Sequence, residues 1–284
     1  MTQLEALDHR LPDLRFVPVD ALVPHEQFDA RRLEPLVKRI QEDGVLRNPP
    51  IVAEFPGRAG RFIVLDGANR ATAARDTGLP HMVVQVVAYH EPQVKLSTWS
   101  HALGDVPRAD LERTLRAIPG LTVREETQMH AQAMLARREV LAYVAYADGT
   151  TDTLEGGADL PARNELLNAV VNTYRERQRY FRLPTDSFRD AAERHPGISS
   201  LVVFPHFEPA EVVELAATGS RLPAGITRHL IRWRALRLNV PLERLADRKS
   251  GTEDKNRWLD EWLRERLMQR QVRFYEESTV SFDE

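Results

Sequence analysis

Cysteine is absent from the 284-residue sequence, and its absence excludes several kinds of chemistry. Disulfide bridges, thiolate metal sites and cysteine nucleophiles all require a thiol group. Long apolar runs are absent too: none approaches the roughly 20 residues that span a bilayer, and the opening MTQLEALDHRLPDLRF has no signal-peptide core. We therefore expect a cytoplasmic protein with no membrane partner.

An excess of positive charge is also missing. The chain carries 39 lysines and arginines against 42 aspartates and glutamates, a net charge of −3, so no general basic field attracts nucleic acid. The nine histidines show no metal-ligand spacing. Neither the G-x-x-x-x-G-K-[ST] loop nor the H-R-D set of protein kinases occurs, which excludes the familiar phosphotransfer folds.

Residues 14 to about 103 mix apolar runs with helical stretches, a pattern typical of a compact α/β unit. The pattern predicts a strand in LRFVPVDALV, an amphipathic helix in ARRLEPLVKRIQEDG and a hairpin from PPIVAEF and RFIVL. Asp29 is the expected N-cap of that first helix, and Gly44 ends it. A short helix over residues 69–77 and a strand in HMVVQVVAY follow.

The remainder of the chain predicts a second set of elements. It contains a hairpin around Asp148-Gly149, a helix in ARNELLNAVVNTYRERQRYFR, a strand in SSLVVF and a helix in PAEVVELAATG. The arginines and tyrosines of YRERQRYFR fit a solvated helix face better than a nucleic-acid contact. The tail predicts a helix in KNRWLDEWLRERLMQR and a strand in VRFYEESTV. We predict an α+β protein with domains at residues 1–103 and 104–284.

The stretch RFIVLDGANRATAARDTG places a glycine turn between a strand and a helix. Free N–H groups and the macrodipole make a helix N-terminus attractive to anions. Gly67 would let a ligand approach the backbone, Arg70 would add a charged hydrogen bond, and Asp66 would accept a proton or hold a cation. The alternative is a simple turn in which Asn69 caps the helix and Arg70 is solvated, and these residues alone favour it.

The setting of this motif resembles the ParB/sulfiredoxin superfamily over about residues 14–90. Within that superfamily, the chain is similar to the free L-serine kinases over a longer range. Four stretches carry the resemblance: FVPVDALVPHEQFDARRLEPL, RFIVLDGANRATAARDTGL, LSTWSHAL and LPAGITRHLIRWRALRLNVPLERL. The tail NRWLDEWLRERL…RFYEES also matches, whereas residues 104–205 match weakly. The resemblance implies a ParB/sulfiredoxin-like N-terminal nucleotide-binding domain and a second α/β lobe, packed against it, that contributes to an amino-acid pocket.

The resemblance also implies roles for individual residues. Glu26 matches the catalytic glutamate, and Asp66 matches the aspartate of the D-G-x-H-R motif, near the γ-phosphate or its Mg²⁺; either carboxylate is a candidate metal ligand. The turn of Gly67, Ala68, Asn69 and Arg70 matches the phosphate-binding turn. Asn69 replaces the usual histidine and cannot carry a positive charge, so a role that needs imidazolium is lost.

Further matches concern the substrates. Thr98, Trp99 and His101 match a stretch that lines the amino-acid pocket. Thr227 and Arg228 match the segment that holds the carboxylate or phosphate of phosphoserine, and a Gly-x-Thr-Arg run suits an anion. Arg47 matches a position near the nucleotide.

The resemblance therefore implies a free L-serine kinase that transfers a phosphoryl group from ATP or ADP, with Mg²⁺, to the serine hydroxyl. Its product, O-phospho-L-serine, would feed siderophore or amino-acid biosynthesis, and the enzyme would be a monomer or dimer without a nucleic-acid partner. Two alternatives remain: a ParB-like nucleotide-binding DNA regulator, which needs a helix-turn-helix and a basic face, and a catalytically silent ligand sensor. A sulfiredoxin-type reductase is excluded because its chemistry needs cysteine.

Overall fold

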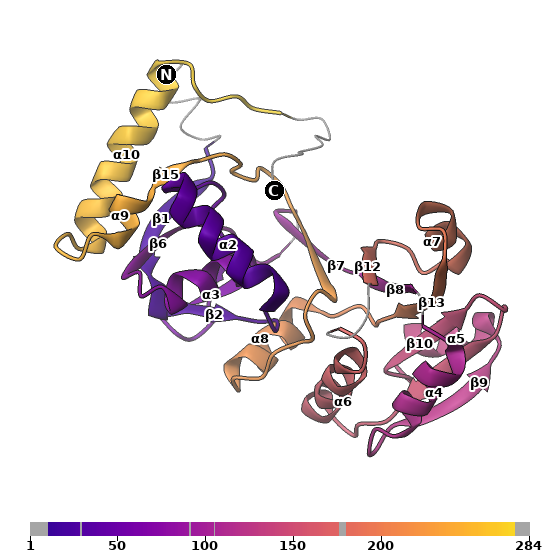
Figure 1. Cartoon of the computed structure of the whole chain (residues 1–284). Helices are drawn as coiled ribbons and strands as arrows, with labels where there is room; N and C mark the ends of the chain where they lie inside the picture. Colours follow the sequence, from indigo (N-terminus) through magenta and orange to yellow (C-terminus); the bar gives the residue numbers. More distant parts are fainter. Residues whose placement is uncertain (1–10, 29, 91, 105, 176–179, 276–284) are drawn as a thin grey trace.

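The computed structural model describes residues 11–28, 30–90, 92–104, 106–175 and 180–275, with only the backbone described for residues 30–32. It has two lobes, each built on one mixed or antiparallel sheet (Figure 1). The predicted α+β class is confirmed. Within the described residues, no helix is both long enough and apolar enough to cross a membrane.

The first lobe contains a five-stranded sheet in the order β1-β6-β4-β5-β2. Its strands are β1 (Asp13–Pro18), β2 (Leu22–Pro24), β4 (Ile51–Glu54), β5 (Phe62–Asp66) and β6 (His81–Val86), and its helices are η1 (Val19–Ala21), α2 (Ala30–Asp43) and α3 (Ala68–Asp76). The predicted β4–β5 hairpin is confirmed. The expected single strand in LRFVPVDALV is wrong: β1 pairs with β6 at one edge and β2 with β5 at the other, so η1 carries the chain between them.

Helix α2 ends where the sequence predicted. Gly44 follows its last residue with a φ of 64°, and its N–H donates to the carbonyl of Ile40 at 3.1 Å. A glycine in this conformation is the usual way to end a helix. The expected N-cap, Asp29, lies outside the described residues.

The second lobe is built on a six-stranded sheet in the order β12-β8-β13-β10-β11-β9, in which every pair is antiparallel. Its strands are β8 (Ser100–Gly104), β9 (Thr122–Glu126), β10 (Ala142–Tyr146), β11 (Thr151–Glu155), β12 (Tyr180–Leu183) and β13 (Ile198–Val203). Its helices are α4 (Arg108–Arg116), α5 (Gln128–Ala136), α6 (Leu160–Asn172), α7 (Phe188–Arg194) and α8 (Pro209–Ala217). The predicted β10–β11 hairpin is confirmed.

Helix α6 is shorter than the sequence pattern predicted. Asp159 caps its start by accepting from the N–H of Ala162 at 2.9 Å, and the helix ends at Asn172. The expected continuation to Arg182 is wrong, because residues 180–183 form the edge strand β12 and pair with β8. The interpretation of this run as one solvated helix face therefore fails at its last residues.

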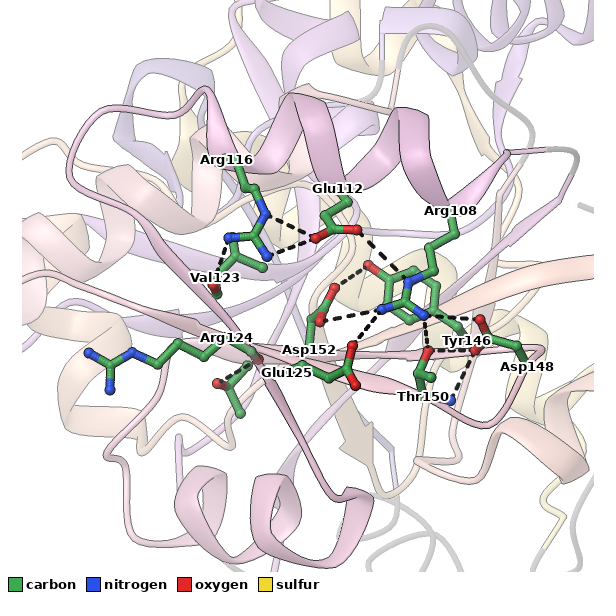
Figure 2. Close-up of polar contacts among 11 residues, drawn as sticks. Arg108, Glu112, Arg116, Val123, Arg124, Glu125, Tyr146, Asp148, Thr150 and Asp152 are labelled. Atoms are coloured by element: carbon green, nitrogen blue, oxygen red, sulfur yellow. Dashed lines mark hydrogen bonds and ion pairs between the residues drawn. The ribbon is translucent and has the colours of Figure 1, made fainter.

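Arg108 joins the start of α4 to the outer strands of the second sheet (Figure 2). Its guanidinium donates to Asp148 and to Glu125, both at 3.0 Å. Asp152 is fully buried beside it and accepts from the hydroxyl of Tyr146 at 2.9 Å. Burial raises the pKa of Asp152. These residues hold the lobe together and do not line the cavity described below.

Two short ribbons accompany the sheets, one running between the lobes and one within the first lobe. Strand β7 (Val94–Thr98) pairs with β14 (Thr227–Ile231), and β3 (Val45–Leu46) pairs with β15 (Val240–Pro241). Figure 1 shows β7 and the segment that contains β14 running between the two sheets. The chain therefore passes from the first lobe to the second and back again.

The C-terminal helices pack against the first sheet. They are α9 (Leu242–Ala246) and α10 (Thr252–Met268). Leu259 and Leu263 of α10 belong to the same apolar cluster as Phe16, and Asn256 makes two hydrogen bonds with the backbone of Phe16. The domain boundary between residues 103 and 104 stays a prediction, but the first lobe also includes α9 and α10, which follow that boundary in the sequence. The expected final strand does not form at residues 271–275, and the rest of it lies outside the described residues.

Candidate active site

A cavity of about 680 Å³ lies between the lobes, within the size range of small-molecule sites. Both lobes and the returning C-terminal segment line it. Its lining includes His25, Glu26, Asp43, Arg47, Asp66, Gly67, Ala68, Asn69, Arg70, Trp99, Arg182, Gly225, Thr227, Arg228, His229 and Arg234. Most of the residues predicted from the sequence therefore meet in one place.

Glu26 lies just after β2 and is held by the segment that precedes β14. Its carboxylate accepts hydrogen bonds from the N–H of Gly225 at 3.0 Å and from the N–H of Thr227 at 2.7 Å. The hydroxyl of Thr227 also contacts Glu26 Oε1. These contacts span about two hundred residues of sequence and orient one carboxylate at the cavity wall.

His25 continues this line of polar groups behind Glu26. Its Nδ1 lies against the carbonyl oxygen of Val64, to which it must donate, and its Nε2 lies 2.8 Å from Thr227 Oγ1. Together with the Thr227–Glu26 contact, this makes three hydrogen bonds in a row. A neutral imidazole, a hydroxyl and a carboxylate supply hydrogens for only two of them. The line therefore has a place for one further proton between Glu26 and His25.

Asp66 ends β5, the parallel neighbour of β2, and faces two arginines. Its Oδ2 accepts from Arg70 Nη2 at 3.1 Å and from Arg234 Nη2. Burial pushes the pKa of Asp66 upward, but the charges of Arg70 and Arg234 outweigh it and hold the pKa below its ordinary value. Asp66 is therefore a carboxylate near neutral pH.

The turn between β5 and α3 has the geometry expected of an anion site. Gly67 has a φ of 89°, and its Cα lies so close to Pro50 that an added Cβ would come within 3.1 Å of Pro50 Cα. Gly67 is the N-cap of α3, so the expectation of Asn69 as N-cap is wrong: Asn69 lies inside the first turn. The first N–H groups of α3 thus adjoin the cavity, with Arg70 beside them.

Trp99 and Arg228 form part of the wall supplied by the second lobe and β14. The guanidinium carbon of Arg228 lies 4.5 Å from the centre of the Trp99 ring. The backbone N–H of Trp99 donates to the carbonyl of Ile226. Arg47 lines the cavity and pairs with Asp43 at 2.9 Å. These positions agree with the roles that the resemblance implied, which stay predictions.

Two residues predicted to line the amino-acid pocket, Thr98 and His101, do not line the cavity. Thr98 donates to the carbonyl of Pro205 at 3.1 Å. His101 is fully buried between the hydroxyl of Tyr174, at 2.8 Å, and the carbonyl of Gly225, at 3.0 Å. Burial lowers the pKa of His101 to about 3, so its ring is neutral. Strand alternation explains the position of Thr98, because it and its neighbour Trp99 point to opposite faces.

Sequence reasoning missed Arg182 and Arg234. Arg182 lay in the run interpreted as a solvated helix, and Arg234 lay inside the matched stretch LIRWRALRLNV without a role of its own. Both reach the cavity because strands distant in sequence place them there. The signal that could have identified them is an arginine directly after or within a short β-rich run, which is weak evidence.

The fold is the one found in the free serine kinases of known structure. A solved free serine kinase in complex with AMP superposes with a TM-score of 0.73 at 21% identity, over 83% of this chain and 94% of that one, which shows a shared fold. No protein-family model matches the chain.

Comparison of sequences then gives particular relatives. The chain is 29% identical over 256 residues to the ATP-dependent L-serine kinase SbnI of Staphylococcus aureus, covering 89% of this chain and 91% of that protein. It is 23% identical over 235 residues to the ADP-dependent L-serine kinase SerK of Thermococcus kodakarensis, covering 82% and 93%. The resemblance to free L-serine kinases that the motifs indicated is confirmed, and it spans most of the chain.

Proposed function

We propose that the protein is a free L-serine kinase, a phosphotransferase with an alcohol group as acceptor. It transfers a phosphoryl group from ATP or ADP to the hydroxyl of L-serine and releases O-phospho-L-serine. The observation that carries the proposal is the cavity that Glu26 and the turn at the N-terminus of α3 line together. The names of the relatives supply the substrate and the donor.

The first lobe supplies the donor side of the reaction. Phosphate oxygens bind to the N–H groups at the start of α3, and the Arg70 guanidinium adds positive charge. Arg234, now paired with Asp66, lies within reach of the same phosphates. Positioning and neutralisation of charge are the main contributions that phosphoryl transfer requires of a protein.

The acceptor side is formed by Glu26 and its neighbours. Glu26 accepts the proton of the serine hydroxyl as the oxygen attacks the phosphorus, and the donor's terminal bond breaks to leave the shortened nucleotide. Thr227 and His25 lie in line to share that proton. Trp99 and Arg228, from the ribbon between the lobes, close the amino-acid pocket.

Magnesium fits this site as a nucleotide-bound ion. Among the described residues, no group of three or more His, Asp or Glu side chains is arranged to hold a metal on its own. Mg²⁺ on a nucleotide needs only one or two carboxylates, its other ligands being phosphate oxygens and water. Asp66 is the residue that would hold it, and Glu26 is already committed to Thr227 and Gly225. The ion would neutralise phosphate charge.

The proposal is tested by incubating the protein with L-serine, Mg²⁺ and either ATP or ADP, followed by ³¹P NMR. We expect a phosphoserine signal that rises in step with loss of the donor's terminal phosphate. Tight nucleotide binding without a serine-dependent product would instead indicate a ligand sensor. Salt-dependent binding of duplex DNA would indicate a regulator.

A further inference from the structure

Arg182 occupies the cavity wall beside the segment that holds Glu26. It lies on β12, opposite His101 of β8, and its guanidinium packs directly onto Gly225. A Cβ added to Gly225 would lie 2.1 Å from Arg182 Nε and 2.2 Å from its Cζ. The guanidinium therefore fills the place that a side chain at position 225 would take.

The charge of Arg182 is not neutralised by the protein within the described residues. Arg70 and Arg234 share Asp66, Arg47 pairs with Asp43, and Arg228 lies over Trp99. Arg182 is partly buried, and its guanidinium has no hydrogen-bond, ion-pair or ring partner in the part of the chain that the structure describes. A partly buried guanidinium in a cavity favours an anion, and its planar fork matches a carboxylate in two parallel hydrogen bonds.

The position of Arg182 beside Gly225 indicates which anion it would bind. Gly225 is a neighbour of both groups, because its N–H donates to Glu26 at 3.0 Å while its Cα faces Arg182. An acceptor whose hydroxyl lies at Glu26 therefore extends its remaining atoms past Gly225. In serine, only two carbons separate the hydroxyl from the carboxylate carbon. The donor phosphates, by contrast, lie at the N-terminus of α3, where Arg70 and Arg234 are already present.

We propose that Arg182 is a specificity-determining residue that binds the α-carboxylate of the amino-acid acceptor and so discriminates against amino alcohols that lack it. This inference rests on the proposed function, since it assigns one end of the same substrate. It assigns to Arg182 the carboxylate that the resemblance gave to the segment of Thr227 and Arg228, because the Arg228 guanidinium is stacked on Trp99.

The test compares two phosphorylated ligands that differ only in the carboxylate. O-phospho-L-serine and O-phosphoethanolamine are titrated by calorimetry into the wild type and into Arg182→Met and Arg182→Lys. We expect the wild type to prefer phosphoserine by about 10- to 100-fold, the range for a charge-assisted pair. Arg182→Met should bind both ligands about equally, and Arg182→Lys should retain an intermediate preference. An unchanged preference in Arg182→Met would overturn the inference.

Matched controls separate the possible failures. Arg189 lies on α7 of the same lobe, is 88% exposed and pairs with Glu193, so Arg189→Met should keep the wild-type preference. ADP affinity reports the integrity of the first lobe in each variant, and Arg182→Lys serves if the methionine variant does not fold. If the wild type neither forms nor binds phosphoserine, the proposed function falls together with this inference. If it does both and Arg182→Met keeps the preference, the assignment of Arg182 falls alone.

Discussion

At the scale of single residues, the proposed chemistry depends on how Glu26 is held. Two backbone N–H groups and one hydroxyl fix its carboxylate, and their donors lie in Gly225 and Thr227. A carboxylate held this way needs no rearrangement when the serine hydroxyl arrives. Since its partners are mainly backbone groups, a change of side chain at position 26 alters the chemistry more than the fold.

Glu26→Gln should therefore remove a base and leave the cavity intact. We expect the turnover number for phosphoserine formation to fall by about 100- to 10,000-fold, the usual contribution of a general base. ADP affinity, measured by calorimetry, should stay within about twofold of wild type, because a general base contributes to the transition state and not to nucleotide binding. A variant with more than a tenth of the wild-type rate would show that Glu26 is not the base.

Residues with a local signature could be predicted from the sequence, and those that depend on distant strands could not. Asp66, Gly67 and Arg70 lie within five positions and formed a recognisable strand–turn–helix motif. Arg182 and Arg234 acquire their surroundings from strand pairing across the molecule, so no short pattern marks them.

At the scale of elements, the start of α3 is the feature that the candidate site requires. The chain turns at Gly67 with a positive φ, and the close approach of Pro50 leaves no space for a side chain. The nine-residue helix buries Ala71, Ala73 and Ala74, small residues that let it lie close to the sheet. The helix was predicted at residues 69–77, one residue late at each end, and its N-cap is glycine and not asparagine.

Gly67→Ala should impair this turn in a way that a similar glycine elsewhere does not. Gly60, in the turn between β4 and β5, has a φ of 73° and no atom within 4 Å of an added Cβ. Both alanine variants should lose about 1–2 kcal/mol of the free energy of unfolding from the positive φ. Only Gly67→Ala should also weaken ADP binding, by about tenfold or more. Equal ADP affinities in the two variants would contradict a phosphate site at α3.

At the scale of the whole molecule, the cavity exists because the chain crosses between the lobes twice. Local apolar periodicity predicted most elements of the first lobe, whereas in the second lobe it did not predict α4, α5, α7, β8, β9 and β12. The return of α10 to the first sheet was not predictable, because the contact of Phe16 with Asn256 joins positions 240 residues apart. The stripe of Trp258, Leu259, Trp262 and Leu263 predicted a buried face but gave no partner for it.

Buried neutral histidines behind the cavity should make the fold sensitive to mild acid. Burial lowers the pKa of His101 to about 3 from an ordinary value of 6.5, so the unfolded chain binds a proton that the folded chain does not. Stability is therefore full above pH 6.5 and is lost as the pH falls toward 3. Between pH 5.5 and 4, His101→Gln should lower the slope of unfolding free energy against pH by about 1.4 kcal/mol per unit.

Denaturant unfolding at several pH values measures this slope. His195 serves as the matched control, since it lies at the end of α7 outside the cavity, and His195→Gln should leave the slope nearer to wild type. Parallel curves for wild type and His101→Gln would show that His101 is protonated in the folded state.

The central claim, that this cavity phosphorylates free serine, is tested most directly by following the donor's terminal phosphate. Purified protein, Mg²⁺ and L-serine are mixed with ATP labelled with ³²P in the γ position or, in a parallel reaction, with ADP labelled in the β position, and the products are separated. We expect the label to appear in O-phospho-L-serine, and only when serine is present. Label that remains on the nucleotide, or that appears only as inorganic phosphate, while folded protein binds the nucleotide, would contradict this claim.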